Sequence, residues 1–256
     1  MKAVVFLGPT LSVKEAEKDL RATYLPPVAR GDVYRATLLR PTPLVIAIID
    51  GSFAQQASVN HKEILWAMAQ GIHVFGASSM GALRAAELAD FGMVGIGQIY
   101  QWLKSGEIED DDEVAIGHGP KQANFVSFTD AMVDMRAIFR AARVDQVISN
   151  ATEDLLLQAS KKTFYLERTY ERSLSLAMQM GADRLEIKDL EFWLQANKRC
   201  LKKADARLLL KTVERFIGSN PECKTVDYVF ERTEFWNRGL GNFELRNTAS
   251  RADSAE

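Results

Sequence analysis

The chain has 256 residues, of which 47% are hydrophobic and 26% are charged, and its formal net charge at pH 7 is −2. This composition is ordinary for a globular protein, and the length suffices for one large domain or for a domain with an appendage. The small net charge excludes a strong basic field that would attract nucleic acid, and no apolar run is long enough to cross a membrane. We therefore expect neither kind of partner.

The cysteine content argues against metal and redox chemistry. Cys200 and Cys223 are the two cysteines, and neither belongs to a C-x-x-C pair. Sparse, unpaired cysteines are typical of a reducing compartment, which predicts a cytoplasmic protein. The glycines of residues 91–97 do not form the G-x-G-x-x-G pattern of a nucleotide loop. No metal and no cofactor is therefore expected.

Short apolar runs separated by helical patterns predict an α/β fold. Residues 3–7 and 44–49 are continuously apolar, as in strands that are covered on both faces of a parallel sheet, and the first strand is predicted over residues 2–7. Residues 72–75 are predicted as a third buried strand and residues 114–116 as a last short one. The expected fold class is α/β, with a small, mostly parallel sheet and flanking helices, followed by an α-helical C-terminal module.

Two helices of this part carry start signals. Ser12 with Glu15, and Asn60 with Glu63, have the spacing of a capping box, in which each side chain bonds the backbone N–H of the other residue. A helix is therefore predicted after Ser12 and another after Asn60.

Lys62 is a candidate base because it lies in the first turn of the second of these helices, next to His61. The positive end of the helix dipole opposes positive charge there and favours the neutral amine, which can accept a proton. The alternative is a solvated lysine without a function, and lysines on helix surfaces are common.

The stretch 71–88 runs from a buried strand to a helix through small residues, with Ser78 and Ser79 between the two elements. Such a turn places a hydroxyl at the carboxyl end of the strand, where the helix start offers free N–H groups for an oxyanion. Ala77-x-Ser79-x-Gly81 resembles the G-x-S-x-G turn of α/β-hydrolases, which favours Ser79 as the nucleophile. Small residues at such a turn also serve close packing alone.

Two further polar residues follow predicted strands. Asp50 ends the run 44–49, either at the functional rim of the sheet or as a turn residue that bonds its own backbone. His118, one of three histidines, could orient a base or donate to a substrate, or could be a turn residue.

Residues 107–113 contain six acids. The segment lacks the glycine and the spacing of a calcium loop, so it offers no metal site. A solvated acidic loop is predicted, with binding of a basic partner as the other option.

From Ser127 onward the strand-like runs stop, and apolar residues recur at helical spacing. We expect an α/β core over residues 1–125, a helical module packed on it over residues 126–246, and a disordered tail over residues 247–256, which are small and polar. Helical patterns cover residues 131–142, 153–161, 164–180, 188–198 and 201–216.

Seven separated motifs occur in the first half: VFLGPTL at 5–11, PPVARGDVY at 26–34, IDGSF at 49–53, HKEIL at 61–65, FGASSMGALRAAE at 75–87, DDDEVA at 110–115 and HGP at 118–120. In this order they resemble the TfuA-like family, over roughly residues 1–125. Beyond them only a helical character is recognisable.

The resemblance implies that the chain acts beside a YcaO-type enzyme, which activates peptide backbone amides with ATP. Together the two would replace an amide oxygen of a peptide substrate with sulfur. The resemblance also implies a hydrolase-like site with a serine–lysine pair, which releases sulfide from the thiocarboxylated C-terminus of a small ThiS-like sulfur-carrier protein.

Carried over to this sequence, the resemblance makes Lys62 the lysine and leaves Ser78 and Ser79 as candidates for the serine, of which the turn geometry favours Ser79. Both loops would open on one rim of a parallel sheet, so that a neutral lysine could take the serine proton while helix-start N–H groups hold the oxyanion. Supporting or substrate-binding roles are assigned to Asp50, His61, Gly76, Gly81, Arg84 and His118.

Two other hypotheses stay open. The chain could be a non-catalytic adaptor that recruits the sulfur carrier and the peptide substrate to a YcaO-type partner, with the helical module and the acidic segment as binding surfaces. It could also be a small-molecule ester or amide hydrolase that needs no partner. The first predicts that Ser79→Ala leaves product yield nearly intact.

Overall fold

The computed structural model describes residues 2–237 except 54–55, 198 and 235. Its centre is one parallel sheet with the strand order β2-β1-β3-β4-β5. The predicted fold class, α/β with flanking helices and further helices toward the C-terminus, is confirmed. The strands are β1 (Ala3–Phe6), β2 (Thr23–Leu25), β3 (Val45–Ile48), β4 (His73–Ala77) and β5 (Val94–Ile96).

This strand order places a topological switch point between β1 and β3. The chain proceeds from β1 to one edge of the sheet, at β2, and from β3 to the other edge, at β5. Ligands of open parallel sheets bind at the carboxyl ends of the strands beside such a point. The turns that follow β1, β3 and β4 therefore form the edge at which a site is expected.

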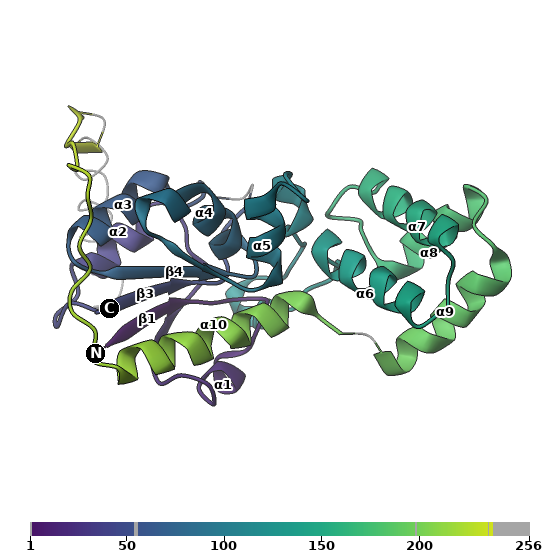
Figure 1. The fold of residues 1–256 in the computed structure, drawn as a ribbon, viewed down its shortest axis with the longest axis horizontal. Coiled ribbons are helices and arrows are strands. Elements are labelled where there is room, and N and C mark those ends of the chain that lie inside the picture. The colour runs from purple at the N-terminus through teal and green to yellow at the C-terminus, as the bar shows by residue number, and fades with distance from the viewer. Residues whose placement is uncertain (1, 54–55, 198, 235, 238–256) are drawn as a thin grey trace.

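Helices cover both faces of the sheet, which is why its strands are continuously apolar. Successive side chains of a strand point to opposite faces, so Val4 packs under one layer of helices and Val5 under the other. One layer consists of α2 (Asp32–Thr37), α3 (His61–Ala69) and α4 (Met80–Leu88), and the other of α1 (Val13–Ala16) and α10 (Leu201–Gly218) (Figure 1).

Both predicted capping boxes are present. Ser12 and Glu15 start α1, and Asn60 and Glu63 start α3. The Glu63 carboxylate also accepts a hydrogen bond of 2.8 Å from the N–H of Gly31, so that it joins the starts of α2 and α3. Burial raises the pKa of Glu63, and the N–H groups that it accepts from oppose that rise.

α10 packs on the sheet, although residues 201–216 were expected in the helical module. Its apolar face, which includes Leu209 and Val213, covers the side of the sheet that α1 leaves open. Its Asp205 carboxylate accepts hydrogen bonds of 3.1 and 2.8 Å from the first two N–H groups of α5 (Gln98–Ser105). Helical spacing predicts which side of a helix is apolar, but not which surface covers that side.

Within the described residues, four further α-helices form a module with its own apolar core, beside the α/β part (Figure 1). No helix there or elsewhere in the described part combines the length and the hydropathy of a membrane span. The predicted boundary at residue 125 stays a prediction, and the predicted tail, 247–256, lies outside the described residues. The four helices are α6 (Met132–Val144), α7 (Asn150–Lys162), α8 (Tyr170–Gln179) and α9 (Arg184–Asn197).

Some local predictions were wrong. Residues 114–116 form no strand, because they follow the 3₁₀ turn η2 (Asp111–Glu113), and Val114 packs in the apolar core beside α5. Residues 164–169 are not helical, since α8 begins at Tyr170. The edge strands β2 and β5 were not predicted, because three residues carry too short a pattern to be recognised.

Gly81 is required where α4 contacts the sheet, because a Cβ atom there would overlap the carbonyl oxygen of Ile48. We expect Gly81→Ala to lower the free energy of unfolding by about 3 kcal/mol or more, as overpacking of a rigid contact does. Urea unfolding measures the loss. Gly218→Ala, in α10, is the matched control: nothing lies within 4 Å of the added Cβ atom, so it should be neutral or stabilise by up to about 1 kcal/mol. Equal losses in the two variants would contradict this account.

Candidate functional site

A cavity with a volume of about 220 Å³ lies at the carboxyl edge of the sheet, at the turns that follow β1, β3 and β4. Three of the predicted site residues line it: Asp50, Ser79 and His118. The opposite wall comes from residues 114–118, from Phe128 and from residues 165–166, which precede α8. The cavity therefore lies between the α/β core and the connections of the helical module.

The turn from β4 to α4 separates the two serines. Ser78 has a φ of 70°, in the left-handed region that non-glycine residues rarely adopt, and it is 0% exposed. Ser79 occupies the N-cap position of α4, yet its side chain makes no capping hydrogen bond. Ser79 is among the residues that line the cavity, whereas Ser78 is not. Of the two candidates, Ser79 is therefore the one that a ligand in this cavity could reach.

The helix start offers less to an oxyanion than the sequence predicted. The Gly81 N–H donates to the carbonyl oxygen of Ile49 at 3.3 Å, and the Ala82 N–H donates to that of Ser79 at 2.9 Å. The Ser79 N–H is also engaged, by Ala77 at 2.9 Å. These three N–H groups are occupied by neighbouring backbone carbonyls, because α4 begins directly against the end of β3.

The Asp50 carboxylate is used to hold the turn after β1. It accepts hydrogen bonds from the N–H of Gly8 (2.8 Å), from the N–H of Thr10 (3.1 Å) and from the Thr10 hydroxyl (2.6 Å). The Thr10 oxygen lies 3.5 Å from the Ser78 oxygen. Asp50 therefore lies on the rim, as predicted, but it bonds the neighbouring loop and not its own turn.

His118 has a defined hydrogen-bonding pattern. Its Nδ1 lies 2.8 Å from the carbonyl oxygen of Gly119, and a carbonyl can only accept, so Nδ1 carries the proton. In the neutral ring Nε2 is then the acceptor, which is the state a general base needs. The ring is half-buried and packs against Phe125.

Lys62 does not line this cavity. Among the described residues, its ammonium group donates to the Thr233 hydroxyl at 3.2 Å and lies over the Phe230 ring. The structure thus pairs Lys62 with the segment after α10 and with neither serine. The role of Lys62 stays a prediction.

The remaining predicted residues stabilise the scaffold around the site. Arg84 and Glu87 pair at 2.6 Å, as predicted, and His61 joins the same carboxylate at 2.7 Å, which ties α3 to α4. Gly76 and Gly81 let the backbones of β4 and α4 meet, since a Cβ atom at Gly76 would overlap the Gly81 carbonyl oxygen. Each therefore acts on the cavity through α4.

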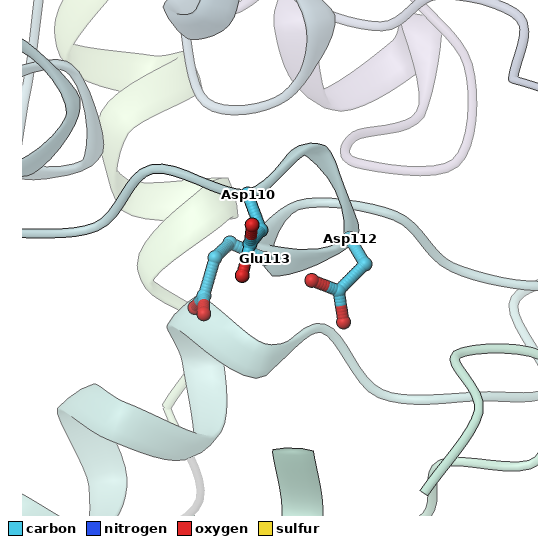
Figure 2. Close-up of side chains that lie close together, drawn as sticks. All are labelled: Asp110, Asp112 and Glu113. Atoms are coloured by element: carbon cyan, nitrogen blue, oxygen red, sulfur yellow. The ribbon is translucent and has the colours of Figure 1, made fainter. Parts of the chain in front are cut away.

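The acidic segment contains a cluster that the sequence did not predict. Figure 2 shows Asp110, Asp112 and Glu113 on one turn of the chain, with carboxylate oxygens within 4.8 Å of one another. Lys161 of α7 contacts all three carboxylates. Glu113 is 2% exposed and Asp112 is half-buried, whereas the other four acids of the segment are exposed. The prediction of a solvated loop is therefore confirmed for those four and wrong for Asp112 and Glu113.

Two arginines also bind this cluster. We call the three carboxylates, Lys161 and these two arginines the ionic joint, because they connect the core with the helical module. The buried Arg168 donates to the side chain and to the backbone carbonyl of Asp112, and Arg136 of α6 binds Glu113 with two hydrogen bonds of 2.8 and 2.9 Å. Three cations thus face three carboxylates. This balance leaves no net negative charge to attract a metal ion.

Comparison with known families supports one relationship. Residues 50–169 match the model of a family described as TfuA-like protein. The chain carries a TfuA-like region. The match begins at Asp50 on the cavity rim and ends just after Arg168 of the joint, so it includes every lining residue of the cavity except Pro9. No curated protein matches the chain.

The ionic joint should make stability depend on acid pH. Burial alone would raise the pKa of Asp112, but hydrogen bonds from Lys161 and Arg168 outweigh it and lower the pKa. The stability that the Asp112 carboxylate contributes is then complete above its pKa in the unfolded chain, about 3.9. It is lost as the pH falls through the lower pKa that Asp112 has in the folded protein. We expect Asp112→Asn to lower the free energy of unfolding at pH 7 by about 1.5–3 kcal/mol. As the pH falls, the variant should also lose less stability than the unaltered protein.

Urea unfolding between pH 7 and pH 2.5 measures both effects. The exposed Asp111, on the same turn, provides the control, and Asp111→Asn should change neither. If the free energy of unfolding falls equally steeply with pH in Asp112→Asn and in the unaltered protein, the joint does not have this role.

A second prediction concerns the hydroxyl of Thr10. Thr10→Val would leave Asp50 Oδ1 without its donor in a buried site, at a cost of about 1–3 kcal/mol in the free energy of unfolding. Thr10→Ser keeps the hydroxyl and should cost less than half as much. Thermal unfolding of the two variants decides the matter, and equal losses would mean that only packing is affected.

Proposed function

We propose that the chain is a sulfur-delivery hydrolase. It would release sulfide from the thiocarboxylated C-terminus of a ThiS-like carrier protein and assist a YcaO-type enzyme in thioamidation of a peptide backbone. The observation that carries the proposal is Ser79, whose hydroxyl makes no helix-cap hydrogen bond and which lines the same cavity as His118. The TfuA-like match supports the sulfur chemistry.

His118 is the base that this geometry favours. Its Nδ1–H bond to the Gly119 carbonyl leaves Nε2 free to accept the Ser79 proton, and both residues line one cavity. Lys62, the base that the family resemblance implies, would first have to leave Thr233 and Phe230. We therefore assign the proton transfer to His118 and retain Lys62 as the competing assignment.

The chemistry then proceeds in two displacements. The Ser79 oxygen attacks the thiocarboxylate carbon as its proton passes to His118, the carbon–sulfur bond breaks, and sulfide departs with that proton. Water next attacks the acyl-serine, His118 takes the water proton, and the carboxylate leaves as Ser79 recovers its hydrogen. The net change is hydrolysis of the thiocarboxylate to a carboxylate and sulfide. Sulfide leaves readily, so the departing group needs little acid assistance.

The competing function is that of an adaptor, and one observation favours it. The Asp50 carboxylate and the N–H groups of Ser79, Gly81 and Ala82 are all engaged within the chain. With these three N–H groups engaged, the turn would hold the carrier's chain end without hydrolysing it. In that case Ser79 and His118 only shape a groove, and the YcaO-type partner would draw the sulfur from the bound carrier.

Sulfide release from a thiocarboxylated carrier separates these functions. The unaltered protein should release sulfide faster than buffer. Ser79→Ala and His118→Ala should each reduce the rate by about 10²–10⁴-fold, the usual contribution of a proton-transfer group. Lys62→Ala should stay within about threefold of the unaltered rate. Ser78→Ala, one residue away, controls for disturbance of the turn, and unfolding midpoints check that each variant is folded.

Each other outcome has a definite meaning. Loss of release in Lys62→Ala with retention in His118→Ala would transfer the base role to Lys62. Retention in Ser79→Ala with loss in Ser78→Ala would move the nucleophile by one residue. Release no faster than in buffer, together with binding of the carrier, would establish the adaptor.

A further inference from the structure

Exposed apolar side chains lie on the two chain segments that form the far wall of the Ser79 cavity. Phe128 and Leu166 line the cavity and are 60% and 43% exposed. Val126 and Phe164, which lie two residues from them in the sequence, are also exposed, and the Phe164 ring contacts that of Tyr165, another lining residue. We call Val126, Phe128, Phe164 and Leu166 the apolar rim. It contains no charged side chain.

The backbone beneath the rim is firmly held. The Phe128 N–H donates to the Gly117 carbonyl at 3.0 Å, and the Gly117 N–H donates to the Thr129 hydroxyl at 2.6 Å. On the other side, the Glu167 N–H donates to the Phe164 carbonyl at 2.8 Å, next to the buried Arg168. Exposed aromatic groups on an ordered backbone lose little conformational entropy on binding, which is how interface anchors are built.

We propose that the apolar rim is the docking surface for the folded body of the protein whose C-terminal end enters the cavity. The inference rests on the proposed function and names the part of the molecule that selects a protein-borne substrate. The cavity, at about 220 Å³, is smaller than the pockets of about 300–1,000 Å³ that enclose drug-sized ligands. It therefore accommodates a short chain end only, and the rest of the carrier must lie against the surface around the mouth.

The rim also specifies the chemistry of its partner. Apolar side chains without a charged neighbour in the set favour a partner that presents its own apolar patch next to a flexible end. A small-molecule substrate held in the cavity would contact Phe128 and Leu166 but would make no use of Val126 and Phe164, which are not lining residues. The carrier is thus the occupant that continuity between the rim and the cavity favours.

The test compares a rim variant with a distant variant of the same residue type. Phe164→Ser changes the rim outside the cavity lining, and Phe192→Ser, on α9 and 77% exposed, is the matched control. Calorimetry measures the affinity of each for the ThiS-like carrier with its ordinary C-terminal carboxylate, which cannot release sulfide. We expect the dissociation constant to rise tenfold or more in Phe164→Ser and to stay within twofold in Phe192→Ser, with weak dependence on salt.

Kinetics with two substrates provide the second readout. The ratio of kcat/KM for the thiocarboxylated carrier to that for a glycylglycine thiocarboxylate should fall at least tenfold in Phe164→Ser. An unchanged ratio with unchanged affinity would overturn the docking surface, and so would equal loss of affinity in Phe192→Ser. If Phe164→Ser weakens carrier binding but neither the unaltered protein nor any variant releases sulfide, the docking surface is supported and the hydrolase function is rejected. If both substrates are hydrolysed but the carrier does not bind above background, the rim falls and the hydrolase stands.

Discussion

The contact between the backbones of α4 and the sheet determines the geometry of the candidate site. Gly76 and Gly81 let the first turn of α4 lie directly on β3 and β4, and the Gly81 N–H bonds the carbonyl at the end of β3. Two residues then have to reverse the chain between β4 and α4. Ser78 does so in a left-handed conformation and is buried, which turns Ser79 toward the cavity. The same contact engages the Gly81 N–H, which an oxyanion could otherwise use.

Buried carboxylates fix the loops around this turn, and this limits the candidates for a base. Asp50 holds the loop after β1, Glu63 joins two helix starts, and Asp205 starts α5. Each of these acids accepts from backbone N–H groups, which favours the charged form and opposes the effect of burial. These carboxylates serve to hold the backbone, and of the three only Asp50 lines the cavity. The other titratable side chains that line the cavity are His118 and Tyr165, and only the imidazole offers a ring nitrogen, Nε2, that can accept while Nδ1 donates to Gly119.

Local sequence signals predicted the α/β core well and the long-range contacts poorly. The apolar runs gave three of the strands, the capping boxes gave two helix starts, and the spacing of Arg84 and Glu87 gave their ion pair. Each of these signals acts over a few residues. In the acidic segment, by contrast, Asp112 is paired with Arg168, 56 positions later. A run of charged residues is predicted to be solvated unless its oppositely charged partners are known. The local sequence does not identify partners that are distant in the chain.

In the candidate site, too, the local sequence predicts some features, whereas contacts between distant residues could not be predicted. That Ser79 ends a strand and starts a helix follows from the sequence around it, and so does the position of Asp50 on the rim. The partner of Lys62 does not, because Thr233 lies 171 positions away. His118 was recognised as a candidate, but its tautomer depends on a backbone carbonyl whose direction only the folded loop defines.

The extent of the family match connects the ionic joint with the cavity. The α/β core alone supplies Asp50 and Ser79, whereas Phe128, Tyr165 and Leu166 come from the connections of the helical module. Arg168 and Lys161 hold that module against η2, so the far wall of the cavity is only as fixed as the joint. A site that needs both walls requires both parts of the chain. This requirement accounts for a TfuA-like region that crosses from the core into the module and ends immediately after the last arginine of the joint.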